Sequence, residues 1–103
     1  MNTAQRKVHA LIQTSNEGYW HPRNVMKKIH EECRELSREV DRAIPRGRTA
    51  PGELAGIRNE AGDLLFAIAC LLNPLGIDFD EAVAESIKKF SRRDKHLYLR
   101  KPL

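Results

Sequence analysis

A run of apolar residues at helical spacing dominates this sequence between positions 22 and 44. The residues follow one another at intervals of three or four positions: Val25, Ile29, Cys33, Leu36, Val40 and Ile44. Such a repeat places all of them on one face of an α-helix. Pro22 stands where a first-turn proline is favoured, and the Pro- and Gly-rich segment 45–52 follows as a breaker. The sequence therefore predicts a long amphipathic helix over residues 22–44 whose apolar face needs a partner.

Two further helices are expected on either side of this one, and no segment has a convincing strand pattern. The first covers residues 3–14, with Val8, Leu11 and Ile12 at helical spacing and Thr3 as a candidate N-cap. The other begins near Glu53 and extends to residue 72. Its second half is apolar on most sides, which favours a central, buried position.

A fourth helix is expected after residues 73–76, whose sequence Asn-Pro-Leu-Gly ends or kinks the preceding helix. Asp78 and Glu81 have the spacing of a capping box at its start. The helix is expected to run to about residue 97 with its apolar side chains turned inward: Ala82, Val83, Ile87 and Phe90. The four elements together predict an all-α, four-helix bundle-like fold.

The length of 103 residues is that of one domain, so residues 1–103 are expected to form a single unit. A content of 41% hydrophobic and 31% charged residues is typical of globular chains. Because a core of this size is thin, we expect dimerisation to complete the bundle. No apolar run approaches the ~18 residues that span a bilayer, and the first residues lack the apolar stretch of a secretory signal. No membrane contact is therefore expected. Cys33 and Cys70 are expected to be reduced core thiols, which favours the cytoplasm.

Two acidic motifs lie beside the apolar faces of the second and third expected helices. The first contains Glu31, Glu32 and Glu35, and the second contains Glu60 and Asp63. At about 100° per residue, each motif occupies one shoulder of its helix. Carboxylates in such positions are partly desolvated when the helices pack, and they repel one another unless a cation joins them.

Helix geometry indicates that the two motifs can meet. At a rise of about 1.5 Å per residue, Glu35 lies ~13.5 Å before the end of its helix and Glu60 ~10.5 Å after the start of the next. If these helices fold back antiparallel, five carboxylates converge in one groove. Mg²⁺ prefers such oxygen ligands together with substrate phosphate oxygens. The alternative is a pair of solvated faces in which Glu31 and Glu35 pair with nearby Lys or Arg, and it is favoured only for either motif taken alone.

In their order along the chain, these residues resemble the MazG-type nucleotide pyrophosphohydrolases. The match consists of EExxE at 31–35, ExxD at 60–63 with its GDLLFA continuation, GID at 76–78 and KFSRR at 89–93. It covers about residues 20–96 and is specific for the superfamily but not for a substrate. The resemblance implies an all-α fold, dependence on Mg²⁺, and assembly as a homodimer or homotetramer. It also implies hydrolysis of NTPs or dNTPs to the monophosphate and pyrophosphate, as in the removal of damaged or surplus nucleotides.

Carried over residue by residue, the resemblance assigns a metal site to four carboxylates: Glu32, Glu35, Glu60 and Asp63. Glu31 would orient or deprotonate the attacking water. This division is chemically reasonable, since attack at the α-phosphorus needs an activated water and neutralisation of the departing pyrophosphate.

Two further groups of residues would contact the nucleotide. Lys89 and Arg93, one helical turn apart, suit the substrate phosphates. A solvated basic face is an equal alternative, because residues 88–103 carry seven Lys or Arg and one acid, Asp94. Trp20, just before the second helix, could stack on the nucleobase, although a lone Trp in this position is more often a hydrophobic staple or an interface residue.

Two other functions stay open at this point. The sister family that hydrolyses phosphoribosyl-ATP has a similar length and similar acids, but it matches the KFSRR segment and the turn at 76–82 less well. The net charge of +4 and the basic C-terminal segment would also suit a non-catalytic nucleic-acid-binding or regulatory helical protein. A binding module has no need for five acids on facing helices, so the enzyme is favoured and a nucleic-acid partner is not.

Overall fold

The computed structural model describes residues 1–46 and 52–92. Its elements are α1 (Thr3–Gln13), α2 (Pro22–Ala43), α3 (Ala55–Leu72), the short 3₁₀-helix η1 (Asn73–Leu75) and α4 (Phe79–Arg92). These two ranges contain no strand, and the predicted all-α fold is confirmed. The helix bounds agree with the expected ones to within two residues, except that the expected end near residue 97 lies outside the described ranges.

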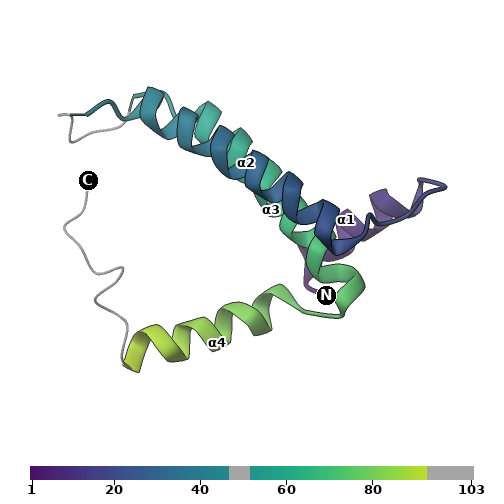
Figure 1. The fold of residues 1–103 in the computed structure, drawn as a ribbon. Coiled ribbons are helices and arrows are strands. Elements are labelled where there is room, and N and C mark those ends of the chain that lie inside the picture. Colours follow the sequence, from purple (N-terminus) through teal and green to yellow (C-terminus); the bar gives the residue numbers. More distant parts are fainter. Residues whose placement is uncertain (47–51, 93–103) are drawn as a thin grey trace.

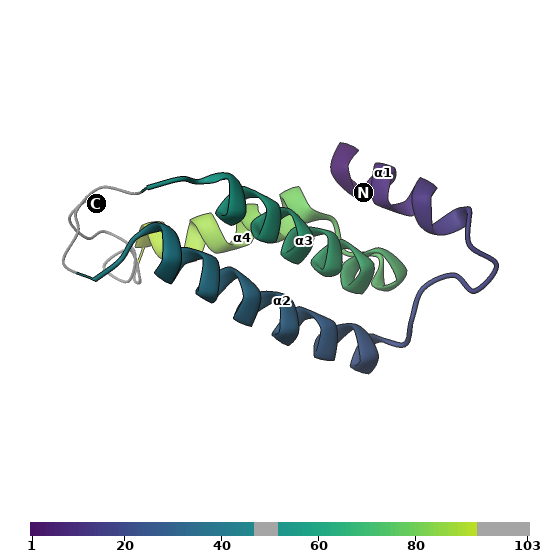
Figure 2. The same cartoon turned by 90° about the horizontal axis from the view of Figure 1, so that it is seen from above.

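An antiparallel hairpin of α2 and α3 forms the most extensive packing in the molecule (Figure 1). Viewed from above, the two helices run side by side along most of their length (Figure 2). Val25 and Ile29 of α2 are buried against Ala67 of α3, whose small side chain allows the helices to approach closely. Partly buried apolar residues of α3 surround this core: Leu64, Ile68, Cys70 and Leu71. The apolar face of α2 thus finds its partner in α3.

The core is thin, because the hairpin is covered only in part. α3 is central, packing against α2 and α1, but Ala67 and Ala69 are its only buried residues. Leu65 of α3 is 56% exposed. On α2, Cys33 is exposed although it lies in the apolar repeat, so the expectation of a core thiol there is wrong; Cys70 is half-buried. Helical periodicity identified the face correctly but not how far along it the partner helix reaches.

α1 is anchored to the rest of the molecule by a buried glutamine. Gln5 is fully buried; its Nε2 donates to the side-chain oxygen of Asn73 (2.9 Å) and to the carbonyl of Ile77 (2.8 Å). Its Oε1 accepts from the backbone N–H of Phe79 at 2.7 Å. The N-cap of α1 is Asn2 rather than the expected Thr3, because Asn2 and Gln5 form a reciprocal capping box. One side chain therefore joins the start of α1 to the start of α4.

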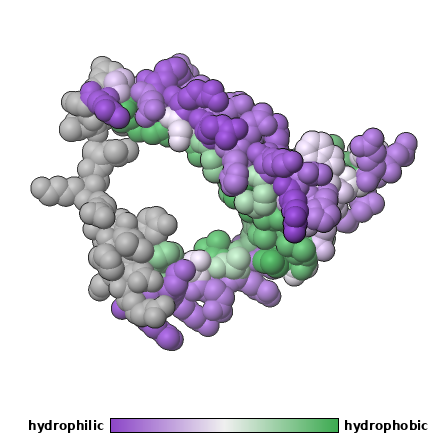
Figure 3. All heavy atoms as spheres, in the orientation of Figure 1, coloured by the Kyte–Doolittle hydropathy of each residue, from purple (hydrophilic) through white to green (hydrophobic). Residues whose placement is uncertain are grey.

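α4 extends away from the hairpin rather than along it (Figure 1). The chain turns at Gly76, which adopts the left-handed conformation with φ 71°, and α4 lies at 102° to the preceding helical segment. Val83 is 56% and Ile87 60% exposed, and Ala82 is also exposed. The expectation that Ala82, Val83 and Ile87 are turned inward is wrong for the described part of the chain, where α4 buries no residue; Phe90 is half-buried. Apolar surface instead gathers where α3 turns into α4 and continues along α4 (Figure 3).

Within residues 1–46 and 52–92, no single helix is long and apolar enough to cross a membrane. By length and composition alone, segment Ala55–Leu75 and α4 meet that test as a bent pair.

Because the core is thin, its few buried side chains should matter strongly. Ile29→Ala removes three methyl or methylene groups from the contact with Ala67 and should lower the free energy of unfolding by about 2–4 kcal/mol. His30→Ala, one position away on the exposed side of α2, should change it by no more than about 0.5 kcal/mol. Urea denaturation of both variants compares the two values, and equal effects would contradict the assignment of this core.

Candidate metal centre

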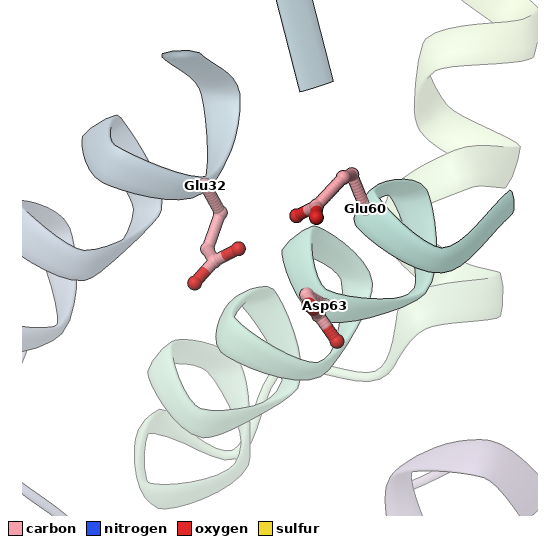
Figure 4. Close-up of side chains that lie close together, drawn as sticks. All are labelled: Glu32, Glu60 and Asp63. Carbon is pink, nitrogen blue, oxygen red and sulfur yellow. The ribbon is translucent and has the colours of Figure 1, made fainter. Parts of the chain in front are cut away.

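Three carboxylates converge between α2 and α3. Glu32 comes from α2, while Glu60 and Asp63 lie one turn apart on α3, and one oxygen of each lies within 4.8 Å of the other two. Figure 4 shows Glu32 and Glu60 pointing toward one another across the gap between the helices, with Asp63 beside them. The antiparallel hairpin therefore brings the two acidic motifs to the same level, as helix geometry predicted.

Two of the three carboxylates are withdrawn from solvent, whereas Asp63 is exposed. Glu32 is 6% exposed, and Glu60 is half-buried. One oxygen of each, Oε2, is buried without a hydrogen-bond partner among the described residues. An unpaired buried carboxylate oxygen is energetically costly, and repulsion between neighbouring acids adds to that cost. A divalent cation would satisfy both oxygens, so the residues present fit a metal ion with a preference for hard oxygen ligands.

The pKa of Glu60 reflects this environment. Burial raises the pKa of the Glu60 carboxyl above its ordinary value of 4.5, and the nearby carboxylates of Glu35, Asp63 and Glu32 raise it further. The Glu35 side chain raises the pKa of Glu60 through its charge and through hydrogen bonding, so it lies near Glu60. Glu35 is therefore adjacent to the three converging acids through Glu60. Three of the four acids assigned to a metal from the sequence converge, and the fourth, Glu35, affects the pKa of Glu60.

Glu31 lies at the edge of this group. Its side chain is 47% exposed and its Oε1 is 3.6 Å from Nζ of Lys28. The same ammonium group lies 3.3 Å from Oε1 of Glu32. The hydrogen bond to Glu32 and the charge of Glu31 raise the pKa of Lys28. The sequence analysis considers pairing of Glu31 with a nearby Lys, but it does not identify the contact of Lys28 with the buried Glu32. The spacing of four positions between Lys28 and Glu32 on one helix is the signal for that contact.

A cavity of about 480 Å³ opens directly beside the acids. Three charged residues of the hairpin line this cavity: Glu32, Asp63 and Lys28. Aromatic and small apolar side chains line the rest, together with part of the α1–α2 connector: Ile12, Ser15, Glu17, Gly18, Tyr19, Trp20, Val25, Phe66, Ala67 and Cys70. Trp20 is 59% exposed and also borders a shallower pocket of about 510 Å³ with Lys27, Lys28 and Glu31. A carboxylate cluster thus adjoins an aromatic-lined cavity.

The connector that carries Trp20 is held in place by the neighbouring tyrosine. The hydroxyl of Tyr19 lies 2.7 Å from Nδ1 of His9 and accepts from Nδ2 of Asn73 at 3.0 Å. The rings of His9 and Tyr19 are stacked with centroids 5.7 Å apart. This network links the cavity wall to the buried Gln5, and the sequence alone gave no signal for it, because its members lie far apart in the chain.

The basic residues expected to bind phosphate lie elsewhere. Lys89 is exposed on α4, with Nζ 4.8 Å from the ring centroid of Phe90. Lys89 is not among the residues that line the cavity or form the acidic group, and α4, which carries it, leads away from the hairpin (Figure 1). Arg93 lies outside the described residues.

Comparison with known proteins connects this site to a family. The family model of the MazG nucleotide pyrophosphohydrolase domain matches residues 21–98, a range that includes all five acids and Lys89. The uncharacterised protein YpjD of Bacillus subtilis (strain 168) is 36% identical over 102 residues, which are 98% of this chain and 92% of that protein.

Two solved structures have the same fold. The crystal structure of the Bacillus-conserved MazG protein, a nucleotide pyrophosphohydrolase, is 38% identical and superposes with a TM-score of 0.74 over 90% of both chains. The crystal structure of YPJD from Bacillus subtilis is 32% identical and superposes with a TM-score of 0.71, covering 84% of this chain and 90% of that one. Sequence and fold thus agree over most of the chain.

Proposed function

The chain belongs to the MazG nucleotide pyrophosphohydrolase family and is a hydrolase of phosphoric anhydride bonds, and from this premise we propose that it cleaves nucleoside triphosphates in a Mg²⁺-dependent reaction. The products are the nucleoside monophosphate and pyrophosphate. The observation that carries this proposal is the group of three converging carboxylates, two of them with unpaired buried oxygens, beside an aromatic-lined cavity. A role in removing damaged or surplus nucleotides would suit such an enzyme.

The metal ligands in this proposal are Glu32, Glu60 and Asp63, with Glu35 beside Glu60. Mg²⁺ bound there would lower the pKa of a bound water and neutralise charge on the departing pyrophosphate. Glu31 is the acid best placed to orient or deprotonate the attacking water, because it borders the group yet stays accessible to solvent. In this proposal Glu32, Glu60 and Asp63 hold the cation, while Glu31 acts on the attacking water.

The aromatic-lined cavity is proposed to receive the nucleoside. Trp20, which is 59% exposed, lines this cavity and would stack on the base, while the phosphates would lie beside Glu32 and Asp63, which line the same cavity. Ile12 of α1 also lines the cavity, which supports treating residues 1–103 as one domain although the family match begins at residue 21.

The experiment that tests this function uses a panel of NTPs and dNTPs, with phosphoribosyl-ATP included for the sister activity. Released pyrophosphate is measured with and without Mg²⁺. In ¹⁸O-labelled water, attack at the α-phosphorus places the label on the monophosphate. Label on inorganic phosphate, with a diphosphate as the other product, would refute the proposed reaction. Mg²⁺-independent turnover would refute the metal site.

Self-association should cover the exposed apolar face of α4. Val83 and Ile87 lie one turn apart on that face, and both are exposed, with no helix of residues 1–46 and 52–92 burying them. A dimer or tetramer would bury them, and the α4 of a second copy would then carry Lys89 to the triphosphate. We expect sedimentation at micromolar concentration to show an oligomer, and the double variant Val83→Glu/Ile87→Glu to shift it toward monomer.

The control for this shift is Lys88→Gln, which removes one exposed charge that pairs with Glu85 on α4 and should leave the oligomer intact. A wild-type protein that sediments as a monomer would contradict the proposed association.

A further inference from the structure

Lys28 occupies a position that no other described cation shares. Its Nζ lies 3.3 Å from Glu32 and 3.6 Å from Glu31, and among the described residues it is the only cation paired with the acidic group. The Glu32 side chain is 8% exposed, whereas that of Lys28 is 46% exposed. A solvent-accessible ammonium group thus neutralises one oxygen of a buried carboxylate, while the other oxygen of Glu32 has no partner.

In this arrangement Lys28 competes with a bound metal ion for the Glu32 carboxylate. A cation held by Glu32, Glu60 and Asp63 would share the Glu32 carboxylate with the ammonium group, and the two positive charges would repel each other at short distance. Lys28 therefore stabilises the metal-free site and weakens metal binding to it. When a metal binds, the Lys28 side chain has room to move, because Lys28 lines both the cavity beside the acids and the shallower pocket.

A nucleotide would change this balance. Its phosphates, placed beside the acids, offer Lys28 a second anion and draw it away from Glu32. Lys28 must move away from Glu32 before the metal binds tightly, and a phosphate group stabilises it in its new position. Metal binding and nucleotide binding are therefore linked through Lys28. By thermodynamic linkage, the nucleotide then tightens metal binding by the same factor by which the metal tightens nucleotide binding.

We propose that Lys28 is an internal counter-ion of Glu32 that couples metal binding to nucleotide binding in the acidic site. The proposal rests on the proposed function and adds to it a regulation of the same site: the metal binds weakly to the free protein and tightly in the presence of nucleotide. Lys28 acts here as a positioning residue, since its effect on the metal passes through Glu32.

The test compares Lys28→Met with Lys27→Met. Lys27 is the adjacent lysine on α2, lines only the shallower pocket, and has no ion pair among the described residues. Mn²⁺ serves as the metal probe in calorimetric titrations, with and without the α,β-imido analogue of the best NTP substrate of the wild type. Without nucleotide, Lys28→Met should bind Mn²⁺ about fivefold more tightly than wild type, the upper range for one partly exposed ion pair.

Three further results are expected. The factor by which the analogue tightens Mn²⁺ binding should shrink in Lys28→Met. The melting temperature of the metal-free Lys28→Met protein should fall, because Glu32 loses its counter-ion, and Mn²⁺ should restore it. Lys27→Met should match the wild type in all of these measurements, and Lys28→Arg, which keeps the positive charge, should retain the wild-type coupling.

Wild-type Mn²⁺ affinity and coupling in Lys28→Met would overturn the inference, and so would an affinity in Lys28→Arg equal to that of Lys28→Met. If Lys28→Met does not fold without metal, the test rests on Lys28→Arg alone. Loss of the coupling between Mn²⁺ and the analogue in Lys28→Arg would also overturn the inference. A wild-type protein that binds no Mn²⁺ under any condition would instead overturn the proposed metal site.

Discussion

Glu60→Gln should abolish turnover and at the same time stabilise the metal-free protein. The variant removes a proposed metal ligand, and even the outer partners of metal ligands cost about 10- to 100-fold when mutated, so kcat/KM should fall by at least about a hundredfold. In the metal-free protein, the same change removes a half-buried carboxylate that three neighbouring acids repel. Activity falls while the stability of the metal-free protein rises, because the clustered carboxylates need a bound cation and repel one another without it.

Steady-state assays, calorimetric Mg²⁺ titration and thermal unfolding in EDTA measure these effects on one preparation. Glu39→Gln is the matched control: it changes the same charge on the hairpin, but Glu39 pairs with Arg42 at 2.8 Å and lies outside the acidic group. It should keep its activity. Full activity of Glu60→Gln with unchanged Mg²⁺ dependence would remove Glu60 from the site.

The hairpin and the level of its acids were predictable because both depend on local rules. Apolar periodicity defines the packed faces of α2 and α3, and the helical rise determines which residues come level once the helices are antiparallel. The convergence of Glu32, Glu60 and Asp63 follows from those two properties. Periodicity could not show that Cys33 would be exposed, because exposure depends on how much of the face a partner covers.

The direction of α4 depends on contacts between residues far apart in the sequence. Gln5 binds Asn73, Ile77 and Phe79, more than sixty positions away, and these hydrogen bonds orient the start of α4. The apolar pattern of α4 correctly indicates a face that needs a partner, but an amphipathic pattern does not say whether the partner is in the same chain. For that reason the inward orientation of Val83 and Ile87 was wrong, while the predicted helix itself was confirmed.

The parts of the site that the sequence did not reveal are likewise non-local. The position of Tyr19 depends on His9 and Asn73, which lie on different elements. The contact of Lys28 with Glu32 is local, but its importance comes from the burial of Glu32, which only the packed hairpin defines. The charges and their levels along the helices thus follow from the sequence, whereas packing determines which of the charges are desolvated.

The stability of the metal-free protein should decrease as the pH rises above about 4.5, and Mg²⁺ should reverse this trend. Because the pKa of Glu60 is higher in the folded protein than its ordinary value of 4.5, the folded state holds this proton more tightly than the unfolded state. The resulting stabilisation is complete below pH 4.5 and is lost as the pH rises through the raised pKa of Glu60. Asp78, whose pKa is lowered mainly by the backbone N–H of Glu81, acts in the opposite direction but only below its ordinary value of 3.8.

Mg²⁺ binds the deprotonated acids, so its affinity should rise over the same pH range. At a Mg²⁺ concentration a hundred times its Kd, binding should add about 2.7 kcal/mol to the free energy of unfolding. Urea denaturation of the wild type and of Glu60→Gln, from about pH 4 to pH 8 in EDTA or in Mg²⁺, measures both effects. In EDTA the wild type should lose stability with rising pH relative to Glu60→Gln, because the amide has no proton to release. Identical pH dependence of the two proteins in EDTA would show that repulsion at Glu60 does not contribute to stability, and the acidic group would then lack the electrostatic strain that a metal ion is proposed to relieve.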